Sequence, residues 1–248
     1  MSESFIYGIH AVEKFLQRTP EQGVELFTVE KRNPRLLSVV GQTRKVKIPV
    51  QFSSRDELSK LAGSDKHQGC VLKIKVVAGQ LKSLEQCISE LDQNSLFLVL
   101  DGVQDPHNLG ACLRSADATG VDAVIIPKDR SAKLNATVRK VAAGGAETVP
   151  LIEVTNLARS LKDLKSAGVW IYGASGDAEQ SVYDFDYKSP VALVMGAEGD
   201  GLRRLTAEQC DQLIKLPMLG SVESLNVSVA TGVCLYEINR ARSACSKP

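Results

Sequence analysis

Reactive polar side chains are concentrated in residues 101–117, which read DGVQDPHNLGACLRSAD and follow directly after an apolar run. Pro106 suits the approach to a helix, and the Asn108 side chain can cap that helix. Arg114 lies five residues after Leu109 and therefore points away from the apolar face of the helix, toward its first turns. A guanidinium there can bind a phosphate or stabilise an oxyanion, whereas the spacing alone favours a solvated surface arginine.

A second segment that suits chemistry is the glycine-rich turn GAEGDGLRR at residues 196–204, which emerges from another apolar run. Its glycines, among them Gly196 and Gly199, permit a close approach of the backbone to a ligand, and Glu198 adds a carboxylate. The order of the glycines differs from the GxGxxG of dinucleotide sites and from the GxxxxGK[ST] of phosphate-binding loops. The turn therefore indicates a binding loop without identifying its ligand.

The third segment, residues 216–232 with the sequence LPMLGSVESLNVSVATG, joins a polar loop to an unusually apolar helix. No Asp, Glu, Lys or Arg occurs between Glu223 and Glu237. A helix that begins near Asn226 and is apolar on most faces is expected to be buried. Its polar entrance, including Ser224, then lies inside the protein, where amides and side chains need partners. A bound small molecule can supply these partners, and an ordinary buried helix with an Asn or Ser cap fits the pattern as well.

Short apolar runs that alternate with helical patterns must position these segments. In the first part of the chain we expect a helix over residues 5–17 and three strands, at residues 25–30, 48–52 and 70–77. In the second part we expect six strands, at residues 96–100, 123–127, 149–152, 169–174, 191–195 and 213–216. Strands that alternate with helices predict an α/β fold with a mainly parallel sheet covered on both faces. Ligands of such sheets bind at the carboxyl ends of the strands, where all three polar segments are expected.

The chain is expected to divide at a short polar stretch that contains Gly79. This division gives a small α/β domain at residues 1–78, a linker at 79–95 and a larger domain at 96–248. Residues 1–78 hold 13 Lys and Arg against 8 Asp and Glu, a net charge of +5, whereas the whole chain has a net charge of only +1. A basic first domain favours contact with a polyanion such as nucleic acid.

Composition excludes several classes of protein. With 248 residues, 44% of them hydrophobic, the chain has enough apolar material for a globular core. Its six cysteines form no CxxC pair and no cluster with metal-ligand spacing, so we expect reduced thiols and no metal. The GxSxG elbow of hydrolytic serines is absent. Neither a signal peptide nor a membrane-spanning run is found, which predicts a soluble cytoplasmic protein.

The three polar segments together resemble the three motifs of the SPOUT superfamily, in its TrmH branch of RNA ribose 2′-O-methyltransferases. The matching stretches are DPHNLGACLRSADATG, LVMGAEGDGL and LPMLGSVESLNVSVATGVCLYE, in the order and spacing of the family. Three further stretches are similar to members that methylate a guanosine ribose in the peptidyl-transferase region of 23S ribosomal RNA. They are IYGIHAV at residues 6–12, HQG at 67–69 and PKDRSAKLNATVRKVA at 127–142. The similarity runs from near Met1 to about Arg242.

The resemblance implies a small ribosomal-protein-like domain that binds RNA, a linker, and a methyltransferase domain whose C-terminal part forms a deep trefoil knot. It also implies S-adenosylmethionine (SAM) as cofactor, 23S ribosomal RNA as substrate, and a homodimer formed through the second domain, without membrane or metal. The positions that match cofactor-binding residues of the family are Gly196, Gly199, Leu216, Met218 and Leu225. The positions that match its catalytic set are Asn108, Arg114, Glu198, Ser224 and Asn226.

Methyl transfer to a ribose 2′-hydroxyl suits these residues, because it requires positioning and removal of a proton but neither a metal nor a covalent intermediate. The resemblance assigns the proton to Arg114, although a guanidinium with a pKa above about 12 is normally never deprotonated. Glu198 is the alternative base or an orienting partner. Three other functions stay open: the same reaction on transfer RNA, a non-catalytic RNA-binding assembly factor, and a nucleotide-binding oxidoreductase, which the lack of GxGxxG disfavours.

Overall fold

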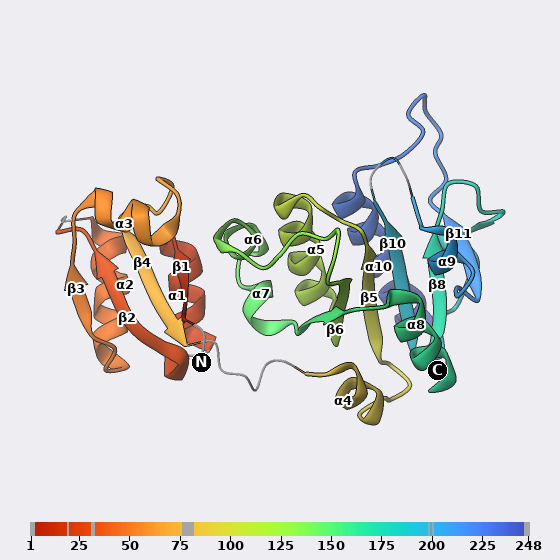
Figure 1. The fold of residues 1–248 in the computed structure, drawn as a ribbon, viewed down its shortest axis with the longest axis horizontal. Helices are drawn as coiled ribbons and strands as arrows, with labels where there is room; N and C mark the ends of the chain where they lie inside the picture. Colours follow the sequence, from red (N-terminus) through yellow and green to blue (C-terminus); the bar gives the residue numbers. More distant parts are fainter. Residues whose placement is uncertain are drawn as a thin grey trace.

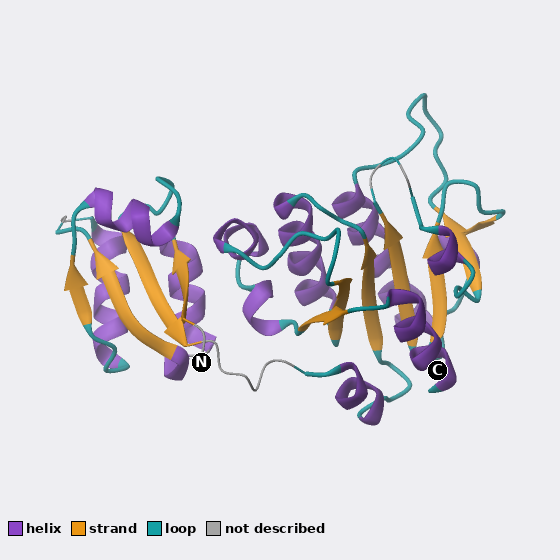
Figure 2. Cartoon of the chain, viewed as in Figure 1, coloured by secondary structure: helices purple, strands orange, loops and turns teal. Residues whose placement is uncertain are grey.

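Two separate β-sheets, each with its own helices, organise the chain (Figure 1). The computed structural model describes residues 3–18, 20–30, 33–75, 82–197, 199 and 201–245. One sheet has four strands in the order β1-β4-β2-β3, and the other has seven in the order β7-β6-β5-β10-β8-β11-β9. Helices lie beside the strands of both sheets (Figure 2), so the predicted α/β fold class is confirmed.

The first domain begins with a strand where a helix was expected. Its elements are β1 (Glu3–Tyr7), α1 (Ile9–Arg18), β2 (Gly23–Thr28), α2 (Pro34–Lys45), β3 (Val50–Phe52), α3 (Arg55–Ala62) and β4 (Cys70–Lys75). The expected helix over residues 5–17 is wrong at its start, because β1 pairs antiparallel with β4. Gly8, with a φ of +94°, then turns the chain into α1. The three expected strands are found as β2, β3 and β4 with shifted ends, and residues 76 and 77 lie outside the described residues.

The HQG stretch of the first domain contacts the start of α1. The Gln68 side chain accepts a hydrogen bond of 3.0 Å from the backbone nitrogen of Ile9, at the start of α1. His67 Nδ1 accepts one of 3.0 Å from Gly69, and burial, followed by the positive charge of Arg55, lowers the pKa of His67. The HQG stretch therefore fixes where α1 begins.

The second domain contains the longer sheet. After α4 (Leu84–Ser89), its elements are β5 (Leu96–Asp101), α5 (Pro106–Thr119), β6 (Ala123–Pro127), α6 (Ala136–Ala142), α7 (Gly145–Thr148), β7 (Leu151–Val154), α8 (Leu157–Ser166), β8 (Trp170–Ala174), β9 (Gln180–Ser181), β10 (Val191–Gly196), α9 (Arg204–Ala207), β11 (Gln212–Lys215) and α10 (Val227–Cys245). All strand pairs in this sheet are parallel. The six expected strands are found as β5, β6, β7, β8, β10 and β11, with ends shifted by one or two residues at most positions.

Successive residues of the central strands pack on opposite faces of this sheet. In β5, Leu98 joins the core beneath α5, α6 and α10, whereas Phe97 and Val99 join the core beneath α4 and α8. Both faces are therefore covered, and the whole of β5 is buried. A strand that is buried on both faces explains the continuous apolar run in the sequence.

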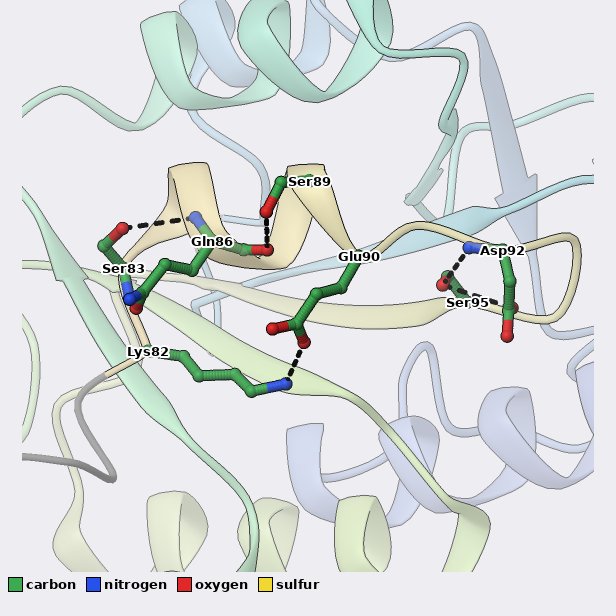
Figure 3. A network of polar contacts seen from close by, with 7 residues as sticks. All are labelled: Lys82, Ser83, Gln86, Ser89, Glu90, Asp92 and Ser95. Carbon is green, nitrogen blue, oxygen red and sulfur yellow. Dashed lines mark hydrogen bonds and ion pairs between the residues drawn. The ribbon is translucent and has the colours of Figure 1, made fainter.

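The expected linker contains an ordered helix. Leu84 and Cys87 of α4 pack on the core beside α8. A capping box starts this helix, in which the Ser83 hydroxyl accepts from the Gln86 nitrogen and the Gln86 side chain accepts from the Ser83 nitrogen (Figure 3). Lys82 pairs with Glu90 at 2.5 Å across the same helix. The domain limits at residues 78 and 96 stay a prediction, but α4 packs with the second domain.

The two domains contact each other through α6 and β1. Lys140 Nζ of α6 lies 5.6 Å from the centre of the Tyr7 ring, within the range of a cation–π interaction. Ala136, at the start of α6, packs against the cluster formed by Tyr7 and its neighbours in the first domain. Because α6 also packs on α5, it connects the first domain to one of the polar segments.

The chain takes an indirect route at the end of the sheet. β10 and β11 follow each other in the sequence but lie on opposite sides of β8. The chain then returns as α10, which packs on α5 and β10. Arg242 of α10 donates hydrogen bonds to the carbonyl oxygens of Tyr187 and Ser189, which precede β10. The trefoil knot stays a prediction, and this return path is consistent with it.

Candidate active site

A cavity of about 1050 Å³ lies at the carboxyl ends of β8, β10 and β11. This is the edge at which ligands of parallel sheets bind, and the volume is at the upper end of that of small-molecule sites. The described residues that line the cavity are 174–177, 195–197, 199, 201, 202, 207, 213–218, 223–227, 230 and 234. Two of the three polar segments therefore meet in one cavity, as the strand order requires.

All five positions expected to bind the cofactor line this cavity. They are Gly196, Gly199, Leu216, Met218 and Leu225. Ser224 and Asn226, from the expected catalytic set, line it as well. The structure thus brings together residues that are up to 30 positions apart in the sequence, and their individual roles stay predictions.

The glycine-rich turn closes on itself directly after β10. Ala197 and Gly201 exchange two backbone hydrogen bonds of 3.1 Å each. A Cβ atom on Gly196 would lie 2.1 Å from the carbonyl carbon of Gly201, so only glycine fits there. Gly199 has a φ of +82°, which also favours glycine. Glu198, the expected catalytic carboxylate of this turn, lies outside the described residues.

The first and third polar segments are joined by a hydrogen bond between two side chains. Asn226 Nδ2 donates to Asn108 Oδ1 at 3.1 Å, and Asn226 Oδ1 accepts from the backbone nitrogen of Ser228 at 2.9 Å. Asn226 therefore caps α10 while its amide nitrogen holds Asn108. Asn108 is 8% exposed, so this bond connects the cavity wall to a buried amide of α5.

The helix cap predicted for Asn108 is wrong. Asp105 caps α5, and its carboxylate accepts from the backbone nitrogen of His107 at 2.9 Å. The reason is that Pro106 occupies the first helical position, which leaves the preceding residue as the cap. Asn108 consequently lies inside the first turn, where its side chain is available to Asn226.

Arg114 does not line the cavity. It lies on α5 about 9 Å along the helix axis from Asn108, at roughly 1.5 Å per residue. Its side chain is exposed and forms no hydrogen bond or ion pair with the residues that the structure describes. The structure therefore places Arg114 on the exposed surface of α5 rather than in the cavity itself.

The helix that carries Arg114 is packed tightly from two sides. A Cβ atom on Gly145 of α7 would lie 2.6 Å from the Leu113 oxygen, and one on Gly110 would lie 2.8 Å from the Val138 oxygen of α6. On the other side, the Cys112 thiol donates to Thr231 Oγ1 of α10 at 3.6 Å. Such close contacts hold α5 in one position relative to α10.

A buried ion pair joins α6 to α7, the two helices that pack on one side of α5. Arg139 of α6 contacts Glu147 of α7 at 2.7 Å, and the two side chains are 9% and 11% exposed.

A second buried acid, Asp101 at the end of β5, accepts a hydrogen bond from the backbone nitrogen of Arg203 at 3.1 Å and lies 3.4 Å from the Arg203 guanidinium. This second contact ties β5 to the glycine-rich turn region. None of these four residues was predicted from the sequence to have a role, although an acid at the end of a buried strand indicates a site at that end of the sheet.

The polar entrance of the last helix is exposed, contrary to expectation. Residues 221–226 are all exposed in the single chain, because the loop between β11 and α10 extends beyond the end of the sheet (Figure 1). α10 also exposes Val229, Val233 and Tyr236, which are 52%, 36% and 60% exposed. These residues are spaced four and three apart and share one face of the helix. The expected full burial is therefore wrong for an isolated chain.

Several lining residues were missed by the sequence analysis. Ser175 and Asp177 follow β8, Lys215 ends β11, and Glu223 precedes the last helix. The rule that ligands bind at carboxyl ends of strands could have identified the segment after β8. Cys234 also contributes to the wall, and burial, with a smaller effect of the Glu237 charge, raises the pKa of its thiol to about 12. This thiol is therefore neutral at physiological pH.

Two classes of site are missing from the part of the chain that the structure describes. Its His, Cys, Asp and Glu residues form no group of three or more that could hold a metal ion. Among the same residues, no helix combines the length and apolarity that crossing a bilayer requires. Five cysteines whose side chains are described are all free: Cys70, Cys87, Cys112, Cys210 and Cys234.

Comparison with known proteins identifies the family. The SpoU rRNA Methylase family matches residues 95–236, and the family described as RNA 2′-O ribose methyltransferase substrate binding matches residues 5–77. The chain is 53% identical over 245 residues to the 23S rRNA (guanosine-2′-O-)-methyltransferase RlmB of Escherichia coli, covering 98% of this chain and 100% of that protein. It is 51% identical to the RlmB of Vibrio parahaemolyticus, covering 98% and 99% of the two chains.

Solved structures show the same fold. The SpoU methyltransferase AviRb of Streptomyces viridochromogenes matches with a TM-score of 0.81 at 21% identity, covering 98% of this chain and 91% of that one. A protein described as an RNA 2′-O ribose methyltransferase matches with a TM-score of 0.80 at 27% identity, covering 97% and 89%. The family models and the relatives above 50% identity confirm the family that the three motifs indicated. The chain therefore belongs to the SpoU rRNA methylase family.

Proposed function

We propose that the chain transfers a methyl group from SAM to the ribose 2′-hydroxyl of a guanosine in 23S ribosomal RNA. The observation that carries this proposal is the joining of the cavity to α5 through the Asn226–Asn108 hydrogen bond. It connects the segments expected to bind the cofactor with the helix expected to meet the ribose. Identity above 50% to proteins named for this reaction, over almost the full chain, supports the substrate.

The cavity suits a cofactor of this size and chemistry. Leu216, Met218 and Leu225 give it an apolar wall, which suits an adenine ring. Gly196 and Gly199 allow the backbone to approach closely, so that backbone amides and carbonyls can bind polar groups. SAM supplies an activated methyl group, so the chain itself needs only to position the ribose and remove a proton.

The protein groups have separate roles in the proposed reaction. The Asn226 and Asn108 amides fix the loop before α10 relative to α5, so that the ribose and the cofactor are held in fixed positions relative to each other. Arg114, exposed on α5, binds the phosphate of the target nucleotide and stabilises the negative charge that develops on the 2′-oxygen. The proton on that oxygen passes to the Glu198 carboxylate. Ser224, on the cavity wall, orients the ribose or the cofactor.

RNA binding is assigned mainly to the first domain. Residues 1–78 carry a net charge of +5, with 13 Lys and Arg against 8 Asp and Glu, and such a surface attracts a polyanion. The match of residues 5–77 to a substrate-binding family supports this assignment. The contact between α6 and β1 places this domain on the side of the second domain where α5 lies.

We further propose a cytoplasmic homodimer formed through the second domain. The exposed stripe of Val229, Val233 and Tyr236 on α10 supports this proposal, because contiguous apolar surface of this kind marks interaction sites. A second copy that covers the stripe would also bury the entrance of the helix. Sedimentation of the Val233→Asp variant tests it, since a charge in the stripe is expected to produce monomers.

The experiment that tests the main function maps 2′-O-methyl groups in RNA from cells that lack the protein. Loss of one guanosine methylation in 23S ribosomal RNA, restored by the wild-type gene, is expected. Loss confined to transfer RNA would instead establish the related transfer-RNA reaction. An unchanged methylation map, together with a defect in ribosome assembly, would favour a non-catalytic assembly factor.

A further inference from the structure

Charged side chains reach the cavity from three different segments. Among the described residues that line it, the charged ones are Asp177, Lys215 and Glu223. They provide two negative groups and one positive group. SAM at neutral pH carries the opposite set, because its ammonium and sulfonium are positive and its carboxylate is negative. The demethylated product, S-adenosylhomocysteine (SAH), keeps the ammonium and carboxylate but has a neutral thioether.

Two of the three charged residues come from neighbouring strands of the sheet. Asp177 follows β8 and Lys215 ends β11, and these two strands are neighbours in the sheet. Ser175 donates its backbone hydrogen bond to Ile214 at 2.9 Å, which holds the turn after β8 against β11. An acid and a base on adjoining segments match the ammonium and carboxylate of an amino acid, and SAM and SAH both carry this amino-acid end.

The remaining carboxylate lies in the segment that reaches α5. Glu223 directly precedes Ser224, Leu225 and Asn226, and Asn226 donates the hydrogen bond to Asn108. The reacting methyl group must face the ribose, and therefore this segment. The sulfonium that carries the methyl group is the only positive charge of the cofactor that has to be on this side.

We infer that Glu223 is a specificity residue that makes the cavity prefer SAM over SAH, whereas Asp177 and Lys215 hold the amino-acid end of both molecules. This inference rests on the proposed function. Loss of the sulfonium charge on methyl transfer removes the attraction to Glu223, so the product is held less tightly than the substrate. Glu223 thereby favours exchange of used cofactor for fresh cofactor.

The size of the effect follows from exposure. Glu223 and Asp177 are both exposed, so water and salt screen their charges. We expect Glu223→Gln to weaken SAM binding about fivefold at low salt. Affinity for SAH should stay within about twofold of wild type, because a neutral thioether has no charge to lose.

Calorimetric titration of the full chain with SAM and with SAH tests the inference, with Asp177→Asn as the matched control. Asp177→Asn is expected to weaken both ligands by the same factor, since both carry the ammonium. Both variants exchange an exposed carboxylate for an amide of equal size, so folding should be unaffected and circular dichroism verifies it. Raising the salt concentration should reduce the ratio of SAM affinity to SAH affinity in the wild type. The same ratio should stay unchanged in Glu223→Gln.

The outcomes separate the inference from the proposed function. If Glu223→Gln weakens SAM and SAH equally, or weakens neither, Glu223 does not distinguish the two molecules and the inference is overturned. If the wild-type chain binds neither molecule, the proposed use of SAM fails, and the inference fails with it. A fall in SAM affinity alone supports both.

Discussion

Asn226 Nδ2 donates a hydrogen bond of 3.1 Å to Asn108 Oδ1, and this bond joins two residues that are 118 positions apart in the sequence. One residue caps the last helix at the cavity wall, and the other is buried in the first turn of α5. Because amide groups have fixed donor and acceptor ends, the bond sets both the distance and the orientation between the two helices at this point. Loss of either side chain breaks this bond, so we expect the two residues to act as one functional unit.

A double-mutant cycle tests this unit. Asn108→Ala and Asn226→Ala are each expected to lower the methylation rate of a 23S ribosomal RNA fragment at least about tenfold. Since each change breaks the same bond, the double variant should be slower than the slower single variant by no more than about threefold. Losses that multiply in the double variant would show that the two amides act independently.

Arg114 is expected to act on the RNA and not on the cofactor. Because its side chain is exposed and does not line the cavity, Arg114→Ala should retain SAM affinity within about twofold while methylation falls at least about a hundredfold. Arg114→Lys should recover only part of the rate, since an ammonium lacks the planar fork of donors. Single-turnover methylation and calorimetry measure the two effects, and full activity of Arg114→Ala would exclude the assigned role.

The buried Arg139–Glu147 pair is expected to matter for stability. Arg139→Met removes the guanidinium that pairs with the Glu147 carboxylate in a largely buried position and should lower the free energy of unfolding by about 3 kcal/mol. The exposed pair between Arg204 and Glu208 provides the control, and Arg204→Met should change stability by less than about 1 kcal/mol. Urea unfolding, followed through the second domain, compares the variants. Equal effects at the two sites would contradict the importance of burial.

Alkaline pH is expected to destabilise the fold through Cys112. Burial raises the pKa of this thiol to about 11, with the hydrogen bond to Thr231 acting in the opposite direction. In the unfolded chain a thiol has a pKa of about 8.5. The unfolded state therefore loses its proton first, so the stabilisation is complete below that value and is lost as the pH rises toward 11.

The measurement compares urea midpoints at pH 8 and pH 10.5 for the wild type and Cys112→Ala. The variant should lose less stability across this range, by about 2 kcal/mol. We expect Cys112→Ala to be less stable than the wild type already at pH 8, because packing around the thiol is lost. This difference does not affect the comparison, which uses the change in stability between the two pH values. Parallel curves for the two proteins would show that this thiol does not titrate differently on unfolding.

RNA affinity is expected to depend on the first domain and on salt. Deleting residues 1–78 removes a net charge of +5, so binding to a ribosomal RNA fragment should weaken, and its dependence on salt should become less steep. Filter binding at several salt concentrations measures both quantities. SAM binding by the shortened chain is the control for its folding, and an unchanged RNA affinity would remove the first domain from the binding site.

Several features could be predicted from the sequence because their causes are local. Continuous apolar runs predicted strands buried on both faces, as β5 shows. The three motifs identified the family, and the cofactor positions from Gly196 to Leu225 all line one cavity. In contrast, the first residues of the chain were assigned to a helix, because β1 pairs with residues of β4 that are 64 to 72 positions away, and such pairing leaves no local signal.

Other features depended on which strands became neighbours. The sequence by itself determined the identity of the polar segments, the side chains within them that can take part in chemistry, and the absence of a CxxC pair. The tertiary structure decided that Arg114 lies outside the cavity and that Asp177, Lys215 and Glu223 share its wall. These outcomes follow from the order β10-β8-β11 and the return of α10 onto α5. The physical reason is that strand order and helix docking are set by contacts between distant segments, which hydrophobic periodicity within one segment does not encode.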